Sequence, residues 1–494
     1  MKEGPSEVSD IVAAANRPEP AMRQYQLLLD GQWTAGKADP IAVHDKYTLT
    51  PFATIAPADA AQVTQMVDAA HAAFRRGSPV AHERGAILDR AAALVEERAA
   101  EFVETMQLEA GFTAADALGE VRRSIQTLKL SAEEARRLAG EMVPLEGAPG
   151  QAGRLAFTLR VPLGVVAAIT PFNAPLNTVA HKIAPAFAAG NAVILKPSTN
   201  TPVTACKLAE VLVEAGMPRG FLSVLHASSA IVQEMLKDQR VRFFAFTGST
   251  EVGRAIQQAA GLRRTQMELG SIAFTILCED AALDVALPKI AAAGYRKAGQ
   301  VCTSVQMLLV HEAIIDTVST RLAGLVAALK YGDPFDADTV VGPLISEKEA
   351  RRIESWITEA VAQGARRLVG GPRRDAVVPP TLLTGVSADM QVGNCEIFGP
   401  VVCIVPFATL DEAIDRVNAT PFGLATGIFT NRLADALAVA RRLEVGGVHI
   451  NETSSSRVDL MPYGGSKDSG FGREGPRYAI HEMTEERLVS ISAA

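Results

Sequence analysis

Short apolar segments alternate with longer helical stretches in the middle of this chain, and this alternation restricts the fold more than any other feature. The segments at 164–170, 192–195, 221–225 and 241–246 are almost wholly apolar. Strands that read as continuous apolar runs are buried on both faces, and intervening helices make them βαβ units. The pattern predicts an α/β fold with a parallel sheet, which binds its ligands at the carboxyl ends of the strands.

A second alternation follows and contains Cys302 in the loop between a helix and a strand. The expected elements are strand 275–278, helix 281–297, strand 305–310 and helix 312–329. Small and polar residues surround Cys302, whereas Cys278 and Cys403 lie in apolar stretches that are typical of packing cysteines. A cysteine on a tight loop can present its sulfur to a cleft, so Cys302 is a candidate nucleophile, with a packing role as the alternative.

Length, charge and cysteine usage exclude several functional classes. A chain of 494 residues is expected to form two or more domains, and a net charge of −7 argues against a nucleic-acid surface. The five cysteines show no disulfide spacing, and neither CxxC nor HExxH is present, so no metal site is expected. Without a signal-peptide pattern or an apolar run near 18 residues, we expect a cytoplasmic protein that does not cross a membrane.

Three further features are compatible with catalysis near Cys302. Glu268 is a candidate general base, although a lone glutamate is usually a solvated side chain. Gly248 and Ser249 lie where a strand gives way to a helix, so free backbone N–H groups there suit a pyrophosphate, although an ordinary turn has the same pattern. Asn173 ends the first strand and can donate to an oxyanion together with the Cys302 N–H, although asparagine is common in turns.

Eight motifs in order resemble those of the aldehyde dehydrogenase superfamily, over about residues 25–488. They are Pro171-Phe172-Asn173, Leu195-Lys196-Pro197-Ser198, Phe246-Thr247-Gly248-Ser249-Thr250, Met267-Glu268-Leu269-Gly270-Ser271, Gly299-Gln300-Val301-Cys302, Glu396-Ile397-Phe398-Gly399-Pro400, Pro421-Phe422-Gly423-Leu424-Ala425 and Pro462-Tyr463-Gly464-Gly465-Ser466-Lys467. Any one of them can arise by chance, but the ordered set is specific.

The resemblance implies NAD(P)-dependent oxidation of an aldehyde to a carboxylic acid. Cys302 would attack the aldehyde to give a thiohemiacetal, whose oxyanion Asn173 and the Cys302 N–H stabilise. Loss of hydride would leave a thioester, and Glu268 would activate the water that hydrolyses it. Lys182 and Glu474 match positions that some relatives use for proton relay or support. CoA-acylating relatives generally lack this base, so the CoA-acylating branch is a less favoured alternative, as is a non-catalytic binding or structural protein.

The resemblance also implies a cofactor site for NAD or NADP. Its residues would be Thr170, Pro171, Phe172, Lys196, Ser198, Thr199, Gly248, Ser249, Val252, Leu269, Glu396 and Phe398. Many relatives carry a glutamate where this chain has Thr199, and that carboxylate would repel a 2′-phosphate. Its absence beside Lys196 makes NADP usable.

The resemblance implies that the substrate is a small-molecule aldehyde, in contact with Arg457, Val301 and Thr303. The segment around Arg457 resembles the subgroup that acts on lactaldehyde and phosphonoacetaldehyde, so its guanidinium is a candidate partner for an anionic substrate group. A structural salt bridge is the alternative. Ala174 and Leu118 are uncharged where relatives carry cationic or imidazole groups, so a phosphonate would lack most of its partners.

The implied architecture is the aldehyde dehydrogenase fold with a Rossmann-like cofactor domain, an α/β catalytic domain and a small β oligomerisation element. The expected limits are 1–22 for an N-terminal extension, 23–142 and 161–269 for the NAD(P)-binding domain, 270–451 for the catalytic domain, and 143–160 with 476–494 for the oligomerisation element. We expect a homodimer or a homotetramer.

Overall fold

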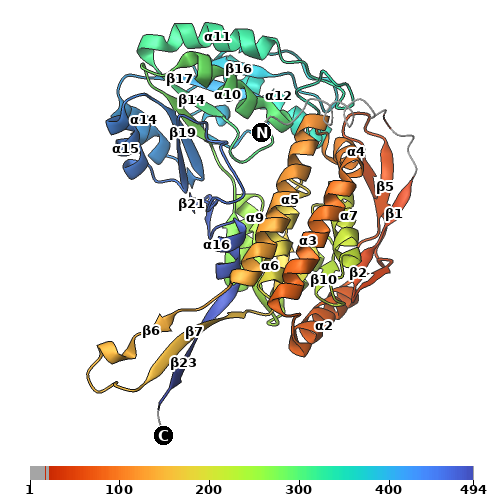
Figure 1. Ribbon diagram of the computed structural model, residues 1–494. Helices are drawn as coiled ribbons and strands as arrows, with labels where there is room; N and C mark the ends of the chain where they lie inside the picture. Colours follow the sequence, from red (N-terminus) through yellow and green to blue (C-terminus); the bar gives the residue numbers. More distant parts are fainter. Residues whose placement is uncertain (1–16, 18–21, 493–494) are drawn as a thin grey trace.

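Two helix-covered sheets and a projecting arm make up the computed structural model of the chain (Figure 1). The structure describes Arg17 and residues 22–492. The expected extension over 1–22 lies outside the described residues, apart from Arg17 and Met22. The described part contains no helix that is both long and apolar enough to span a membrane.

The first sheet has eight strands and a parallel centre. In sheet order they are β22 (Gly470–Phe471), β12 (Arg264–Glu268), β11 (Val241–Thr247), β8 (Val165–Ile169), β9 (Ala192–Lys196), β10 (Leu222–Val224), β2 (Leu27–Leu29) and β3 (Gln32–Thr34). The five strands from β12 to β10 run parallel, and the outer strands are antiparallel to their neighbours. This arrangement confirms the predicted α/β class.

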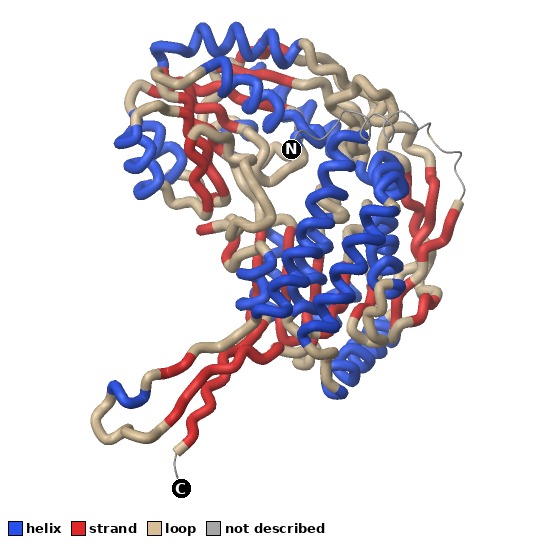
Figure 2. The backbone as a smooth tube through the Cα atoms, in the orientation of Figure 1, coloured by secondary structure: helices blue, strands red, loops and turns tan. Residues whose placement is uncertain are grey.

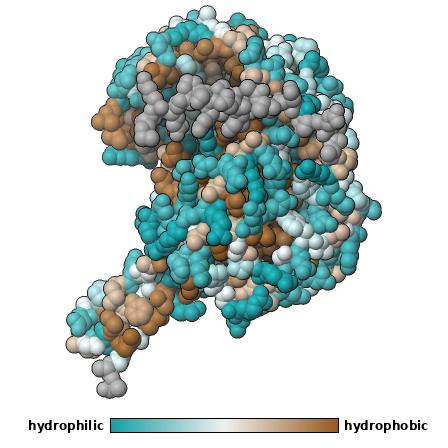
Figure 3. Space-filling model, turned by 45° about the vertical axis from the view of Figure 1, so that its right-hand side comes forward, coloured by the Kyte–Doolittle hydropathy of each residue, from teal (hydrophilic) through white to brown (hydrophobic). Residues whose placement is uncertain are grey.

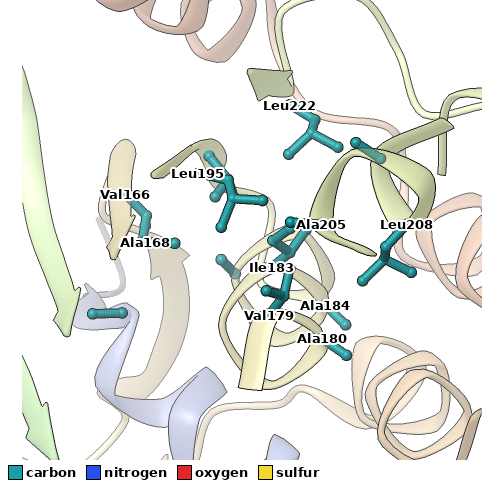
Figure 4. Close-up of a cluster of buried hydrophobic side chains, with 14 of the residues drawn as sticks. Val166, Ala168, Val179, Ala180, Ile183, Ala184, Leu195, Ala205, Leu208 and Leu222 are labelled. Atoms are coloured by element: carbon teal, nitrogen blue, oxygen red, sulfur yellow. The ribbon is translucent and has the colours of Figure 1, made fainter. Parts of the chain in front are cut away.

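Helices cover both faces of this sheet. They are α2 (Ala60–Arg76), α3 (Ala81–Glu97), α4 (Ala99–Ala110), α5 (Ala114–Arg137), α6 (Asn177–Ala188), α7 (Pro202–Glu214), α8 (Ser229–Lys237), α9 (Thr250–Ala260) and α16 (Pro476–Glu482). α6 packs on β8 and β9 with α5 outside it, and α2 contacts the same two strands. Figure 4 shows the resulting core, in which Val166 and Leu195 of the strands meet Val179, Ile183 and Leu208 of the helices.

The second sheet has seven strands and is likewise mostly parallel. In sheet order they are β15 (Arg366–Val369), β16 (Thr381–Thr384), β17 (Val401–Phe407), β14 (Met307–His311), β13 (Phe274–Leu277), β19 (Ala425–Phe429) and β20 (Gly447–Ile450). Its helices are α10 (Leu283–Tyr295), α11 (Ile315–Ala327), α12 (Glu347–Ala362), α13 (Gln391–Asn394), α14 (Leu410–Asn418) and α15 (Leu433–Arg442), with the 3₁₀ helix η3 (Glu312–Ile314) before α11. This sheet has its own apolar core, which begins at Ile272.

Three smaller sheets complete the fold. One joins β1 (Arg23–Tyr25), β5 (Pro51–Ile55) and β4 (Ile41–His44), and another pairs β18 (Phe422–Gly423) with β21 (Ser466–Lys467). The third is the projecting arm, in which β7 (Leu155–Pro162) pairs antiparallel with β23 (Thr484–Ile491) on one side and with β6 (Met142–Val143) on the other. The 3₁₀ helix η1 (Leu145–Gly147) lies in the connection between β6 and β7. In Figure 2 the strands of this arm extend away from the rest of the chain.

Two elements differ from what the sequence pattern indicates. The segment Arg264–Glu268 forms strand β12 although it is mostly polar, because its first residues lie near the surface while its end is buried. Residues Pro476–Glu482, expected in the β oligomerisation element, form helix α16, which packs on α5 and α6. The other domain limits stay a prediction.

Asn191 joins three parts of the first core, so its loss should destabilise the fold. Its Oδ1 accepts from the Gly164 N–H at 2.9 Å, and its Nδ2 donates to the carbonyls of Met483 at 2.9 Å and Ala186 at 3.2 Å. Asn191→Ala leaves buried backbone groups without partners, at a cost of about 2–4 kcal/mol. Thermal unfolding should show a lowered Tm, whereas Asn200→Ala, at an exposed position, should leave the Tm unchanged. Equal Tm values for both variants would contradict this role.

Candidate active site

Two cavities meet at Cys302. The larger, of about 480 Å³, lies along the carboxyl ends of the first sheet, and the smaller, of about 60 Å³, lies on the other side of the cysteine. Four residues line both cavities: Asn173, Thr247, Glu268 and Cys302. A molecule in each cavity can therefore reach the same sulfur.

The larger cavity lies where the strand order of the first sheet reverses. From β8 the chain proceeds to β9 and β10 on one side and then to β11 and β12 on the other. Loops that leave neighbouring strands in opposite directions open a crevice at such a point. All twelve residues expected at the cofactor site line this cavity: Thr170, Pro171, Phe172, Lys196, Ser198, Thr199, Gly248, Ser249, Val252, Leu269, Glu396 and Phe398.

The donors of this cavity fit a dinucleotide. Ser249 caps α9 by accepting from the Val252 N–H at 3.4 Å, so the helix presents its positive N-terminus to the cavity. The Thr170 hydroxyl is buried and has no hydrogen-bond partner among the described residues, as expected of a group that awaits a ligand. Burial lowers the pKa of Lys196, which lies at the end of β9 beside Thr199.

Glu396 and Phe398 lie at the end of the larger cavity near Cys302. Glu396 accepts from the Ser271 N–H at 3.0 Å, and burial raises the pKa of its carboxyl to about 8. The Phe398 ring stands edge-on to that of Phe172, with centroids 5.8 Å apart. These groups offer a carboxyl group and an aromatic wall to a flat, hydroxyl-bearing ligand.

The loop that carries Cys302 begins with an unusual backbone. In the 3₁₀ helix η2 (Arg296–Gly299), Lys297 and Ala298 have φ angles of 50° and 53°, and Gly299 has 70°. A side chain at Gly299 would lie 2.0 Å from the Gly399 carbonyl, so this glycine is required for a close approach as well as for its φ. Left-handed residues that are not glycine persist only where the surroundings hold them.

Lys297 supplies that restraint. Its buried ammonium donates to Glu120 at 2.7 Å and to the Asn173 carbonyl at 3.0 Å, and its backbone N–H donates to Asp116 at 3.0 Å. The Asn173 side-chain amide in turn donates to the Gln300 carbonyl at 2.8 Å. The amide expected to bind an oxyanion is thus fixed to the cysteine loop from both sides.

The Tyr463 hydroxyl lies between the two candidate reacting groups. It is 2.8 Å from the Cys302 sulfur and donates to Glu268 Oε1 at 3.3 Å. Burial, with the charge of Glu474, raises the pKa of Glu268 to about 7. Burial, the charge of Glu268 and a hydrogen bond with its carboxyl raise the pKa of the Cys302 thiol well above its ordinary value, while the hydrogen bond with Tyr463 opposes this rise.

Glu474 is held charged by two cations. Burial alone would raise its pKa, but Lys182 at 3.0 Å and Arg457 at 2.9 Å hold the pKa of Glu474 well below its ordinary range. Lys182 lies behind the cavity lining, whereas Glu474 and Arg457 line the smaller cavity. The salt bridge considered for Arg457 is therefore present, and its guanidinium also stacks on the Tyr463 ring, 3.7 Å from the centroid.

Four cations line the smaller cavity, together with the expected residues Val301 and Thr303. Three have carboxylate partners: Arg457 pairs with Glu474, Lys297 with Glu120, and Arg123 with Asp459 at 2.7 Å. The fourth cation, Arg296, has no ion-pair partner of this kind among the described residues.

The Arg296 guanidinium donates to the Ser455 hydroxyl at 2.7 Å, and Ser455 in turn contacts the Thr303 hydroxyl at 3.2 Å. No carboxylate among residues 22–492 lies within 4 Å of it, and burial lowers its pKa from the ordinary value. Asp116 and Glu120 act on this cation only from beyond ion-pair distance, and a half-buried guanidinium without a direct carboxylate partner is a ready partner for an anion.

Sequence reasoning missed Arg296, Arg123 and the contact of Tyr463. Tyr463 belongs to a recognised motif, which could have directed attention to its hydroxyl. Arg123 lies far from Cys302 in the sequence, and no local pattern connects the two. Arg296 precedes the nucleophile by six positions, but a basic residue at the end of a helix is usually solvated.

Comparison with known proteins agrees with this geometry. The model of the aldehyde dehydrogenase family matches residues 33–489. The 3-sulfolactaldehyde dehydrogenase of Priestia aryabhattai is 46% identical over 473 residues, which cover 95% of this chain and 98% of that protein.

Two solved structures share the fold. Aldehyde dehydrogenase 21 of Physcomitrella patens, in complex with the reaction product succinate, has a TM-score of 0.93 and 37% identity, covering 96% of this chain and 99% of its own. A glyceraldehyde-3-phosphate dehydrogenase of Methanocaldococcus jannaschii, complexed with NADP, has a TM-score of 0.89 and 36% identity, covering 92% of this chain and all of its own. The resemblance inferred from the motifs is confirmed: the chain belongs to the aldehyde dehydrogenase family, and its reaction is the NAD(P)-dependent oxidation of an aldehyde.

Proposed function

We propose that the protein oxidises a short aldehyde bearing an anionic group, through a thioester on Cys302. The observation that carries this proposal is the unpaired Arg296 guanidinium in the small cavity beside the Cys302 sulfur. A volume of about 60 Å³ suits a short chain, and the cation suits a carboxylate or a sulfonate.

Cys302 is the nucleophile of this reaction. Its thiolate attacks the aldehyde carbon, and the carbonyl oxygen becomes an oxyanion. The Asn173 amide, fixed to the cysteine loop through Gln300, donates to that oxygen together with the Cys302 backbone N–H. Donors that are already in place need no reorganisation during the step, so they favour the charged adduct over the neutral aldehyde.

The larger cavity holds the cofactor. Gly248 and Ser249 at the N-terminus of α9 would bind the pyrophosphate, Lys196 the adenosine ribose, and Glu396 and Phe398 the nicotinamide end. NAD or NADP, when bound, supplies the hydride acceptor. With Thr199 in place of a carboxylate, a 2′-phosphate beside Lys196 meets attraction and no repulsion, so NADP is usable.

Glu268 activates the water that hydrolyses the thioester. A carboxylate with a pKa near 7 is a stronger base than an ordinary glutamate, and a substantial fraction of it is still ionised in neutral solution. Lys182 and Arg457 keep Glu474 ionised, and the negative charge of Glu474 adds to burial in raising the pKa of Glu268. Glu474 and Lys182 thus support the base electrostatically.

Arg296 binds the anionic group of the substrate. The names and ligands of similar proteins support this class: one acts on a sulfonated aldehyde, one structure holds succinate, and one enzyme is named for a phosphorylated aldehyde. Arg457, engaged by Glu474 and stacked on Tyr463, shapes the wall of the cavity.

The arm gives a basis for a homodimer or homotetramer. β23 is the edge strand of its sheet, and exposed apolar side chains gather there, as the brown surface at the lower left of Figure 3 shows. They are Met142, Leu155, Leu159, Leu488 and Ile491. A free edge with apolar neighbours favours pairing with a second copy.

The free thiols, Cys302 among them, suit the reducing cytoplasm that we propose as the compartment.

Reduced nicotinamide should form when the enzyme, NAD or NADP, and a short anionic aldehyde are combined without CoA. Cys302→Ser should abolish turnover, because the hydroxyl is a far weaker nucleophile than the thiolate. Cys278→Ser, outside both cavities, should retain it. Turnover that requires CoA would contradict the hydrolytic step, and turnover by the Cys302 variant would contradict the thioester.

The rate of hydrolysis should depend on the ionisation of Glu268. Its carboxylate is the active form, so below about pH 7 kcat should fall as the group is protonated, by about tenfold per unit at the acidic limit. Glu268→Gln should lower kcat by about 10²–10⁴-fold, because the general base is lost. Glu97→Gln, exposed on α3, should keep the wild-type profile. An unchanged acidic limb in the Glu268 variant would assign the titration to another group.

Substrate discrimination should depend on Arg296. Arg296→Met removes a charged hydrogen bond to the anion, so kcat/KM for a sulfonated or carboxylated aldehyde should fall by about 10–100-fold. Activity with propanal should change little, since it has no anionic group. Arg321→Met, exposed on α11, is the matched control. Equal losses with charged and neutral aldehydes would contradict recognition of the anion.

A further inference from the structure

We propose that Tyr463 is a catalytic residue whose hydroxyl carries the proton from the Cys302 thiol to the Glu268 carboxylate. This inference rests on the proposed function and adds a proton path between the two groups on which that function depends. The path consists of two hydrogen bonds: 2.8 Å between the Cys302 sulfur and the Tyr463 oxygen, and 3.3 Å from that oxygen to Glu268 Oε1.

The direction of the path follows from counting protons. An ionised carboxylate can only accept, so the single Tyr463 proton is directed to Glu268. The phenolic oxygen then has lone pairs free to accept the S–H of Cys302. When the thiol proton moves to Tyr463 and the phenol proton moves to Glu268, the products are a thiolate, a neutral tyrosine and a protonated glutamate. The new O–H of Tyr463 points back at the sulfur and stabilises the thiolate.

The same path operates in reverse at the end of the reaction. After it has released the first proton to solvent, Glu268 accepts one from the water that attacks the thioester. The C–S bond breaks, and the departing Cys302 thiolate recovers a proton from Glu268 through Tyr463. The thiol and the carboxylate are restored, and one proton has left the site, as the oxidation of an aldehyde to an acid by NAD(P) requires.

The position of the hydroxyl is restrained by contacts of the Tyr463 backbone and of one face of its ring. Tyr463 and Glu474 exchange backbone hydrogen bonds, with N···O distances of 3.1 and 2.6 Å. The Arg457 guanidinium covers one face of the ring, and its ion pair with Glu474 fixes that cation in turn. A packing role alone would be served equally by phenylalanine, whereas here the hydroxyl joins two titratable groups.

The need for such a path is set by the environment of the thiol. Burial and the nearby carboxyl raise the pKa of Cys302 well above its ordinary value, so few molecules hold a thiolate without help. The charged and titratable groups that face this hydroxyl or its partners are Cys302, Glu268, Arg457, Glu474 and Lys182. Of these, the charge of Arg457 stabilises the Cys302 thiolate. The Glu268 carboxylate destabilises that thiolate until the carboxylate accepts the proton.

Alkylation of Cys302 in the cofactor-free enzyme tests the relay without any need for turnover. The rate of iodoacetamide labelling at the Cys302 peptide, followed by mass spectrometry across pH, reports the thiolate. Tyr463→Phe keeps the ring beneath Arg457, so we expect the fold to persist, and circular dichroism checks this. The labelling rate at neutral pH should fall about tenfold and its midpoint should rise by about one pH unit. Tyr331→Phe, exposed and remote, should match the wild type.

A double-variant cycle separates a relay from a simple hydrogen bond. Removing the hydroxyl should reduce labelling about tenfold when Glu268 is present, and by less than about twofold in Glu268→Gln, where the proton acceptor is already lost. An equal reduction in both backgrounds would overturn the relay, and a wild-type profile in Tyr463→Phe would overturn the whole proposal. Wild-type turnover without CoA is measured separately, so failure of the proposed function is distinguishable from failure of the relay.

Discussion

The buried ion pair between Lys297 and Glu120 is the interaction on which the active-site geometry depends. Both side chains are almost wholly excluded from solvent, so each charge requires the other. Lys297 also binds the Asn173 carbonyl and lies in a left-handed conformation that begins the cysteine loop. One side chain therefore ties the Cys302 loop, Asn173 and helix α5 together, and the backbone strain of the loop is sustained by this buried charge.

A second set of charges gives two neighbouring carboxyls different roles. Glu268 and Glu474 are both buried. Glu474 forms ion pairs with Lys182 and Arg457, whereas Glu268 forms no ion pair with either cation. The pKa of Glu474 is lowered and that of Glu268 is raised to about 7. Two carboxyls in one site whose environments separate their pKa values are suited to one structural and one chemical task. Arg457 belongs to this arrangement, which explains why it is less available to a substrate than its sequence motif suggests.

Much of the fold could be predicted because it depends on local pattern. The buried strands β8, β9 and β11 are continuous apolar runs, and each is followed by a helix with clear periodicity. β12 escaped this reasoning because polar residues continue into its buried part, where Gln266 and Glu268 flank Met267 and break the apolar run. Cys302, Glu268 and Asn173 were accessible because each lies in a short motif. The first parallel sheet brings Asn173 and Glu268 to one edge, whereas the loop before β14 of the second sheet brings Cys302. The three residues can thus be identified from local sequence, whereas the distances between them depend on the tertiary structure.

The substrate cavity could not be predicted in the same way, because its character depends on which charges remain unpaired. The sequence directs attention to Arg457, yet Arg123, Lys297 and Arg457 are each neutralised by a carboxylate distant in the chain. Arg296 is left without such a partner among the described residues, and this distinction exists only once Asp459, Glu120 and Glu474 have been placed in space. A basic residue can serve as an anion receptor where a direct counter-charge is absent, so the specificity that we propose is a property of the whole set of pairings.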